Sequence, residues 1–248
     1  MNTEAVIHYL AEWLEEKVVA AGASGVVVGL SGGIDSAVSA CIAKRAFPDD
    51  TLAIMMPCKS DVNDLQHAQL LAEANKICYS IVDLGNAYDS LLDIYEKAME
   101  SEKQILLRAN IKPRLRMTTL YFFAQAKNYL VLGTSNKSEI VIGYATKYGD
   151  NAVDIQIIGD LLKKEVYALA DHLEIPEVII NKPPSAGLWK DQTDEQEMGL
   201  TYQELDEYLE SNSGSEVTIT RIKEMISRSE HKRSLPLIAR IPQSVRQR

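Results

Sequence analysis

The 248-residue sequence has few of the residues from which metal centres and disulfide frameworks are built. Its three cysteines form no C-x-x-C pair, and its four histidines form no H-x-x-x-H pair. Zinc sites need such ligands at short spacing, so we expect none here. Cys41, Cys58 and Cys78 lie in or beside apolar runs, which favours buried, reduced thiols in a cytoplasmic protein.

The sequence also lacks long hydrophobic runs and an excess of positive charge. No apolar stretch approaches the roughly 18 residues that a membrane span needs, and Met1–Ala5 does not begin a signal peptide. The formal net charge is −9, whereas general nucleic-acid binders are basic. We therefore expect a soluble protein with neither a nucleic-acid nor a membrane partner.

The apolar pattern predicts one α/β domain over residues 1–248. Buried-strand runs alternate with stretches at helical spacing. Strands are expected at 25–30, 51–57, 77–84, 129–133 and 153–158, and helices at 3–21, 37–47, 61–76, 86–127, 161–173, 202–211 and 217–229. This order implies a doubly wound parallel sheet flanked by helices, with ligands beyond the carboxyl ends of the strands. Residues 181–200 are polar, and we expect a mobile, lid-like excursion there.

The stretch Gly29–Ser36 (GLSGGIDS) reads as a strand, a tight turn and the start of a helix. Gly32 and Gly33 allow positive φ and close approach of a ligand, and free N–H groups at a helix start favour a phosphate. No lysine of the G-x-x-x-x-G-K-[ST] type is present, and G-x-G-x-x-G is also missing. Asp35 would repel a phosphate unless a divalent cation lies between them. The plainer alternative is an ordinary strand-to-helix turn of small residues.

A second group of polar residues follows the expected strand 129–133. Its Glu139 is a candidate second ligand for Mg²⁺, which usually takes one or two protein carboxylates. Further back, the segment Arg108–Met117 concentrates positive charge in an acidic chain. Pro113 fits the first turn of a helix, so Arg114 would lie near a helix start, either solvated or in contact with an anion.

These motifs together resemble a known family. Ser31-Gly32-Gly33-Ile34-Asp35-Ser36 is similar to the SGGxDS pyrophosphate loop of the N-type ATP pyrophosphatases, whose fold is of the adenine-nucleotide alpha-hydrolase, Rossmann-like type. Gly133–Glu139, Gly143-Tyr144 and Thr146–Asp150 resemble the signature of ammonia-dependent NAD synthetases, with agreement over about residues 4–240. The resemblance implies that ATP activates the carboxylate of deamido-NAD as an acyl adenylate, from which ammonia displaces AMP to give NAD.

The resemblance also implies roles for individual residues. Asp35, Asp150 and Lys163 correspond to catalytic positions, with Asp150 orienting or deprotonating ammonium, and Asp35 and Glu139 to Mg²⁺ ligands. ATP-binding positions correspond to Gly29, Leu30, Ser31, Gly32, Gly33, Ile34, Asp35, Ser36, Thr134, Lys163 and Ser185. Positions that contact deamido-NAD correspond to Arg114, Lys147, Asp154, His231 and Lys232. Family members are homodimers, and helices 3–21 and 114–130 are candidate contact surfaces.

Two departures from the family pattern stand out. Ser185 stands where the family often has Thr, so the hydroxyl is kept. The segment Cys58–Val62 differs from the sequence usual in the family, so the resemblance does not assign the residues that surround the adenine of ATP. Because no amidotransferase domain is visible in the chain, we expect free ammonia as the nitrogen donor. The alternatives are a GMP-synthetase-like or tRNA-modifying enzyme of the same fold, and an ATP-sensing regulatory module without turnover.

Overall fold

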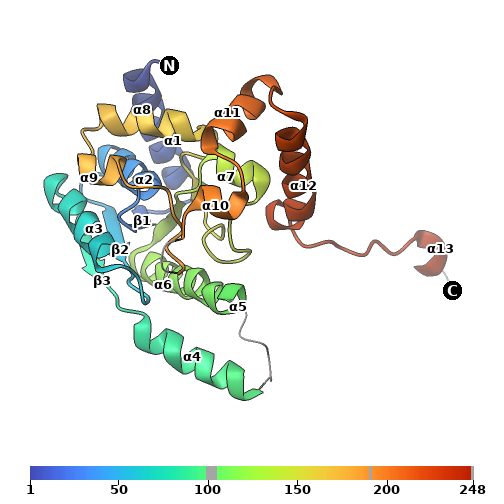
Figure 1. Ribbon diagram of the computed structural model, residues 1–248. Helices are drawn as coiled ribbons and strands as arrows, with labels where there is room; N and C mark the ends of the chain where they lie inside the picture. Colours follow the sequence, from blue (N-terminus) through green and yellow to red (C-terminus); the bar gives the residue numbers. More distant parts are fainter. Residues whose placement is uncertain (99–104, 190–191, 247–248) are drawn as a thin grey trace.

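The computed structural model describes residues 1–98, 105–189 and 192–246 (Figure 1). Its centre is a parallel sheet in the order β3-β2-β1-β4-β5. The strands are β1 (Gly25–Gly29), β2 (Thr51–Met55), β3 (Cys78–Ile81), β4 (Tyr129–Gly133) and β5 (Ile155–Gln156). The strand order reverses direction between β1 and β4, and such a point opens a crevice at the carboxyl ends of the strands. The expected parallel α/β fold is thus confirmed.

Alternation along the strands builds an apolar core on each face of the sheet. Val26 and Val28 of β1 pack into one core, whereas Val27 packs into the other. Helices α1 (Thr3–Ala20), α2 (Ile34–Ala46), α3 (Val62–Ala74) and α8 (Lys163–His172) contribute to the first core, and α4 (Gly85–Ala98) and α6 (Ile111–Lys127) to the second. Both faces are therefore covered, as the hydrophobic strands require.

The later part of the chain has an apolar cluster of its own. It joins α7 (Lys137–Ile142), α10 (Asp194–Met198), α11 (Tyr202–Ser211) and α12 (Glu216–Arg233) through Ile142, Met198, Leu205 and Ile222. In Figure 1 these helices stand beside the sheet, and the chain beyond α12 runs outward to α13 (Gln243–Arg246). Short helices α5 (Ile105–Ala109) and α9 (Glu177–Ile180) complete the described elements. No described helix is long and apolar enough to span a membrane.

Several sequence expectations were wrong in detail. The strand expected at 153–158 is only Ile155–Gln156, and side chains take over the neighbouring hydrogen bonds: Asp154 Oδ2 accepts from Val131 N–H at 2.8 Å. Within the polar stretch 181–200, whose lid-like mobility stays a prediction, Gln192 and Asp194 are buried. Cys78 is exposed, although Cys41 and Cys58 are buried as expected. The single-domain organisation of residues 1–248 stays a prediction.

Candidate active site

The turn after β1 has the geometry of an anion cradle. Gly32 has φ +78°, and a Cβ there would overlap the backbone carbonyl of Asp64, so this position requires glycine. Gly33 is extended (φ −101°), so of the two glycines Gly32 is the one that uses a positive φ. Ser31 and Ser36 hydroxyls lie 3.0 Å apart, and Ser36 Oγ accepts from Ser31 N–H at 3.2 Å. No side chain caps α2, so N–H groups in its first turn remain for a ligand.

This turn opens into a cavity of about 730 Å³ at the carboxyl ends of the strands. Of the positions assigned to ATP, the cavity is lined by Gly29, Leu30, Ser31, Gly33, Ile34, Asp35, Ser36, Thr134 and Ser185. Gly32 instead faces α3. Ser185 is exposed, and its Oγ accepts from Gly187 N–H at 3.1 Å. The phosphate turn and the 181–189 segment, which are about 150 residues apart in the chain, thus line the same cavity.

A buried lysine, Lys163, does not itself line this cavity but joins the two predicted metal ligands that do, Asp35 and Glu139. Lys163 Nζ, at the start of α8, lies 2.5 Å from Asp35 Oδ2 and 3.6 Å from Glu139 Oε1. The Lys163 side chain is 2% exposed, against 19% for Asp35 and 14% for Glu139. Asn136 Nδ2 donates to the other oxygen of Asp35 at 2.9 Å. The structure therefore brings together three residues that lie far apart in the sequence.

The charges in this cluster depend on one another. Burial, together with the nearby Asp35 carboxylate, raises the pKa of Glu139. Burial works against the Lys163 charge, but Asp35 and Glu139 outweigh it, so the pKa of Lys163 is raised. Lys163 is thus held as a cation beside Asp35 and Glu139.

The donor set fits a small divalent cation. Asp35 and Glu139 offer hard carboxylate oxygens close to one another, because both reach the same ammonium. Mg²⁺ is bound in this way, through one or two carboxylates and the phosphate oxygens of a nucleotide. Among the described residues no cluster of three or more acidic, histidine or cysteine side chains could hold a metal, so the remaining ligands would come from phosphate and water.

Another part of the cavity wall carries most of the residues assigned to deamido-NAD. Arg114, Lys147, His231 and Lys232 all line it, as does Asp150. Arg114 donates to the Lys147 carbonyl at 3.3 Å, and Lys232 Nζ donates to the carbonyls of Gly143 and Ala145. Asp150 is exposed to solvent, but protein atoms surround it on its other sides, and this partial burial raises its pKa. Burial lowers the pKa of Lys232.

Asp154 is the one residue assigned to deamido-NAD that does not line this cavity. Its side chain is exposed beside β5, and its oxygens accept from Val131 N–H and Tyr121 O–H at 2.8 and 3.1 Å. Within one chain it buttresses β4. Its contact with deamido-NAD stays a prediction.

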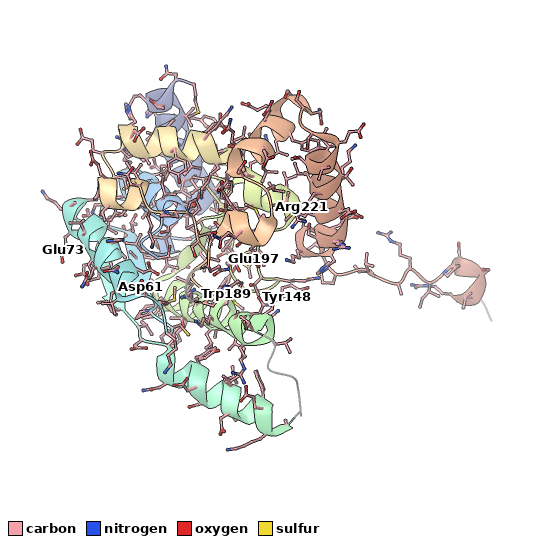
Figure 2. The ribbon with its side chains drawn as sticks, viewed as in Figure 1. Asp61, Glu73, Tyr148, Trp189, Glu197 and Arg221 are labelled. Carbon is pink, nitrogen blue, oxygen red and sulfur yellow. The ribbon has the colours of Figure 1, made fainter. Side chains whose placement is uncertain are left out.

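The structure also adds residues that sequence reasoning missed. The Tyr202 hydroxyl lies 3.1 Å from Glu139 Oε1 and 2.9 Å from Asp194 Oδ2, and its single hydrogen is donated to one of them at a time. Asp206 accepts from Ser138 and from the Lys164 N–H. Figure 2 labels Glu197 on α10, above Trp189 and Tyr148 in the view. Only one local signal was readable: Asn136 and Glu139 have the spacing of a capping box, which they form at α7. The contacts of Tyr202 with Glu139 and of Asp206 with Ser138 join residues 63 and 68 positions apart, so no local pattern marks them.

Comparison with known proteins identifies the family. Residues 6–236 match the family model described as NAD synthase. The NH(3)-dependent NAD(+) synthetase of Syntrophomonas wolfei is 57% identical over 248 residues, covering 99% of this chain and 100% of that protein. The solved NMN synthetase of Francisella tularensis superimposes with a TM-score of 0.92 at 38% identity, covering 97% of this chain and 100% of that one. For the NH3-dependent NAD synthetase of Campylobacter jejuni the TM-score is 0.80 at 33% identity, with 97% and 100% coverage. The chain therefore belongs to the NAD synthase family.

Proposed function

We propose that the cavity carries out the ATP-dependent amidation of deamido-NAD with ammonia, giving NAD, AMP and pyrophosphate. One observation carries this proposal: the phosphate turn, the Asp35–Glu139 pair and a basic wall line a single cavity. The wall supplies Arg114, Lys147 and Lys232 for an anionic dinucleotide. The family match over residues 6–236 favours this reaction over GMP synthesis and tRNA modification.

The chemistry follows from the poor reactivity of a carboxylate toward an amine. The nicotinate carboxylate attacks the α-phosphate of ATP, the bond from the α-phosphorus to the bridging oxygen breaks, and pyrophosphate leaves. Ammonia then attacks the acyl carbon and expels AMP. The Gly29–Ser36 turn holds the departing pyrophosphate, and Lys163 lies where its cation can offset developing phosphate charge. Positioning and charge neutralisation supply most of the catalysis.

The cation that we propose at Asp35 and Glu139 is Mg²⁺. When bound, it would neutralise the charge that accumulates on the phosphates as pyrophosphate leaves. The two carboxylates would hold it from the side of β1 and of β4, and in its absence the Lys163 ammonium offsets the repulsion between them. Mg²⁺ added to the stripped protein should restore turnover, whereas a requirement for zinc would contradict this assignment.

An assay with purified protein tests the reaction. Deamido-NAD and Mg-ATP are supplied with either ammonium or glutamine, and NAD and pyrophosphate are measured. We expect NAD with ammonium and little with glutamine. Equal NAD from the two donors would contradict ammonia dependence, and pyrophosphate release that ignores deamido-NAD would contradict the substrate. An ATP sensor without turnover would release neither product.

A second candidate substrate is nicotinic acid mononucleotide, whose amidation gives NMN. The similarity to the Francisella tularensis NMN synthetase, at a TM-score of 0.92, favours this alternative. The bond formed is the same, and only the adenylate half of the acceptor is missing. Comparing kcat/KM for the two acceptors decides between them: we expect deamido-NAD to be preferred, and a preference for the mononucleotide would establish the alternative.

We also propose that the chain acts as a homodimer in the cytoplasm. Phe122 on α6 and Tyr9 and Val19 on α1 are exposed apolar residues on the two helices predicted to supply the contact. Light scattering should give twice the chain mass, and a monomeric mass would contradict the dimer. Cell fractionation tests the location.

A further inference from the structure

One buried carboxylate to which no role has been assigned, Asp194, contacts both Tyr202 beside the metal carboxylates and Tyr144 in the cavity wall. Asp194 opens α10 and is 4% exposed. Its Oδ2 accepts from Tyr202 O–H at 2.9 Å, and its Oδ1 accepts from Tyr144 O–H at 3.0 Å. Its backbone N–H donates to the carbonyl of Pro184, next to Ser185, at 3.0 Å. Burial raises the pKa of Asp194, so placing a carboxyl here has a cost that suggests a role.

The Tyr202 contact leads to the metal carboxylate. The Tyr202 hydroxyl is also 3.1 Å from Glu139 Oε1, and its ring lies 4.8 Å from Lys163 Nζ. Glu139 is otherwise oriented by the backbone N–H of Asn136, which binds its second oxygen at 3.3 Å. The Tyr202 hydroxyl has a single hydrogen, which it donates to Asp194 or to Glu139, and Asp194 holds that hydroxyl against the oxygen of Glu139 that faces Lys163. Phenylalanine in its place would keep the ring but lose both contacts.

The Tyr144 contact leads to the basic wall. Tyr144 stands between Gly143 and Ala145, whose carbonyls both accept from Lys232 Nζ, at 2.9 and 2.7 Å. The Tyr144 hydroxyl also lies 2.8 Å from Glu197 Oε2. The position of this short segment determines where Lys232 is held. Asp194 is thus bonded to one hydroxyl on the metal side and one on the acceptor side.

We propose that Asp194 is a positioning residue that aligns the two halves of the site. Through Tyr202 it orients Glu139 for the cation. Through Tyr144 it orients the segment that holds Lys232 for the acceptor. This inference rests on the proposed function, and it assigns to the 192–198 segment a part in assembling the site rather than only in covering it.

Three nearly isosteric variants separate the two contacts of Asp194, one through Tyr202 and one through Tyr144: Tyr202→Phe, Tyr144→Phe and Asp194→Asn. Each is first checked by circular dichroism and its melting temperature. Mn²⁺, used as a paramagnetic stand-in for Mg²⁺, is titrated by electron paramagnetic resonance in the presence of an ATP analogue with a methylene bridge between the α and β phosphates. Deamido-NAD binding is measured by calorimetry. Neither measurement needs turnover, so a failure of the proposed reaction in the parent is recognised separately.

The expected pattern is specific to each contact. Tyr202→Phe should weaken Mn²⁺ binding about tenfold, as second-layer changes at metal sites commonly do, and leave the deamido-NAD affinity within about twofold. Tyr144→Phe should do the reverse, and Asp194→Asn should weaken both. If Asp194→Asn does not fold, the two tyrosine variants still decide the question. Parent-like Mn²⁺ binding in Tyr202→Phe would overturn the proposal, as would identical profiles for the two tyrosine variants.

Discussion

Two aspartates, the half-buried Asp35 and the buried Asp194, reach the Lys163–Glu139 cluster from different parts of the chain. Asp35 comes from the β1–α2 turn and contacts Lys163 directly at 2.5 Å. Asp194 comes from α10 and reaches Glu139 only through Tyr202. The first is placed by a strand, a glycine turn and a helix that follow one another in sequence. The second is placed by packing of the later helices around a separate apolar cluster. The comparison separates what local sequence determines from what only the tertiary fold determines.

The largest effect is expected when the cation of this cluster, Lys163, is removed. Lys163→Met leaves the Asp35 and Glu139 carboxylates buried and facing one another. Breaking a buried ion pair by deleting one partner costs about 3–5 kcal/mol, so the metal-free variant should unfold at much lower denaturant concentration. Added Mg²⁺ with ATP should restore part of this stability, because a cation again separates the carboxylates. Urea titrations with and without Mg-ATP measure both effects.

The control for that experiment is Lys137→Met. Lys137 pairs with Asp160 at 3.0 Å, but both side chains are exposed, at 39% and 97%. Exposed pairs contribute about 0–1 kcal/mol, so this variant should unfold near the parent. A Lys163→Met protein as stable as the Lys137→Met protein would show that the buried pair has little structural role.

The next largest effect is on kcat, and it concerns the two predicted metal ligands, Asp35 and Glu139. Asp35→Asn and Glu139→Gln keep the shape of each side chain but remove the charge that would hold the cation. Each should reduce kcat by about a hundredfold or more, the size found when a group that stabilises transition-state charge is deleted. Steady-state NAD formation at saturating Mg-ATP is the measurement. Asp160→Asn, an exposed acidic residue near α8, serves as the matched control and should leave kcat unchanged.

The same comparison explains how much could be predicted from the sequence. The parallel sheet, the Gly29–Ser36 turn and the pairing of Asp35 with Glu139 follow from short patterns at the carboxyl ends of β1 and β4. Lys163 came only with the family resemblance, because nothing near it in sequence marks a buried lysine. Tyr202 and Glu139 are separated by 63 positions. Such a contact depends on how α7, α10 and α11 pack. Without that information, the polar sequence of residues 181–200 suggested only a mobile lid.

A smaller effect is expected from Asp206 on α11, which binds the first turn of α8, where Lys163 lies. Its Oδ1 accepts from Ser138 O–H at 2.5 Å, and its Oδ2 accepts from the N–H of Lys164, in the first turn of α8, at 2.9 Å. Removal of a comparable helix-start acceptor costs about 1 kcal/mol, so Asp206→Ala should lower the free energy of unfolding by that order. The variant should also lower kcat without changing the affinity for deamido-NAD. Parent-like values of both would remove α11 from the support of Lys163.

The smallest effect concerns Lys112, which ties α6 to the 181–189 segment. Lys112 is 6% exposed, and its Nζ donates to the Leu188 carbonyl at 2.7 Å. Burial lowers the pKa of Lys112 below its ordinary value of 10.5. Between the lowered folded pKa and 10.5 the unfolded chain binds more protons at this group, so its contribution to stability increases as pH rises through that window. Lys112→Met removes this dependence and one hydrogen bond, a loss of about 1 kcal/mol. The difference in unfolding free energy between parent and Lys112→Met should therefore grow from pH 8 toward pH 10.5, and a difference that shrinks would show that the lysine is stabilised as a cation at this position.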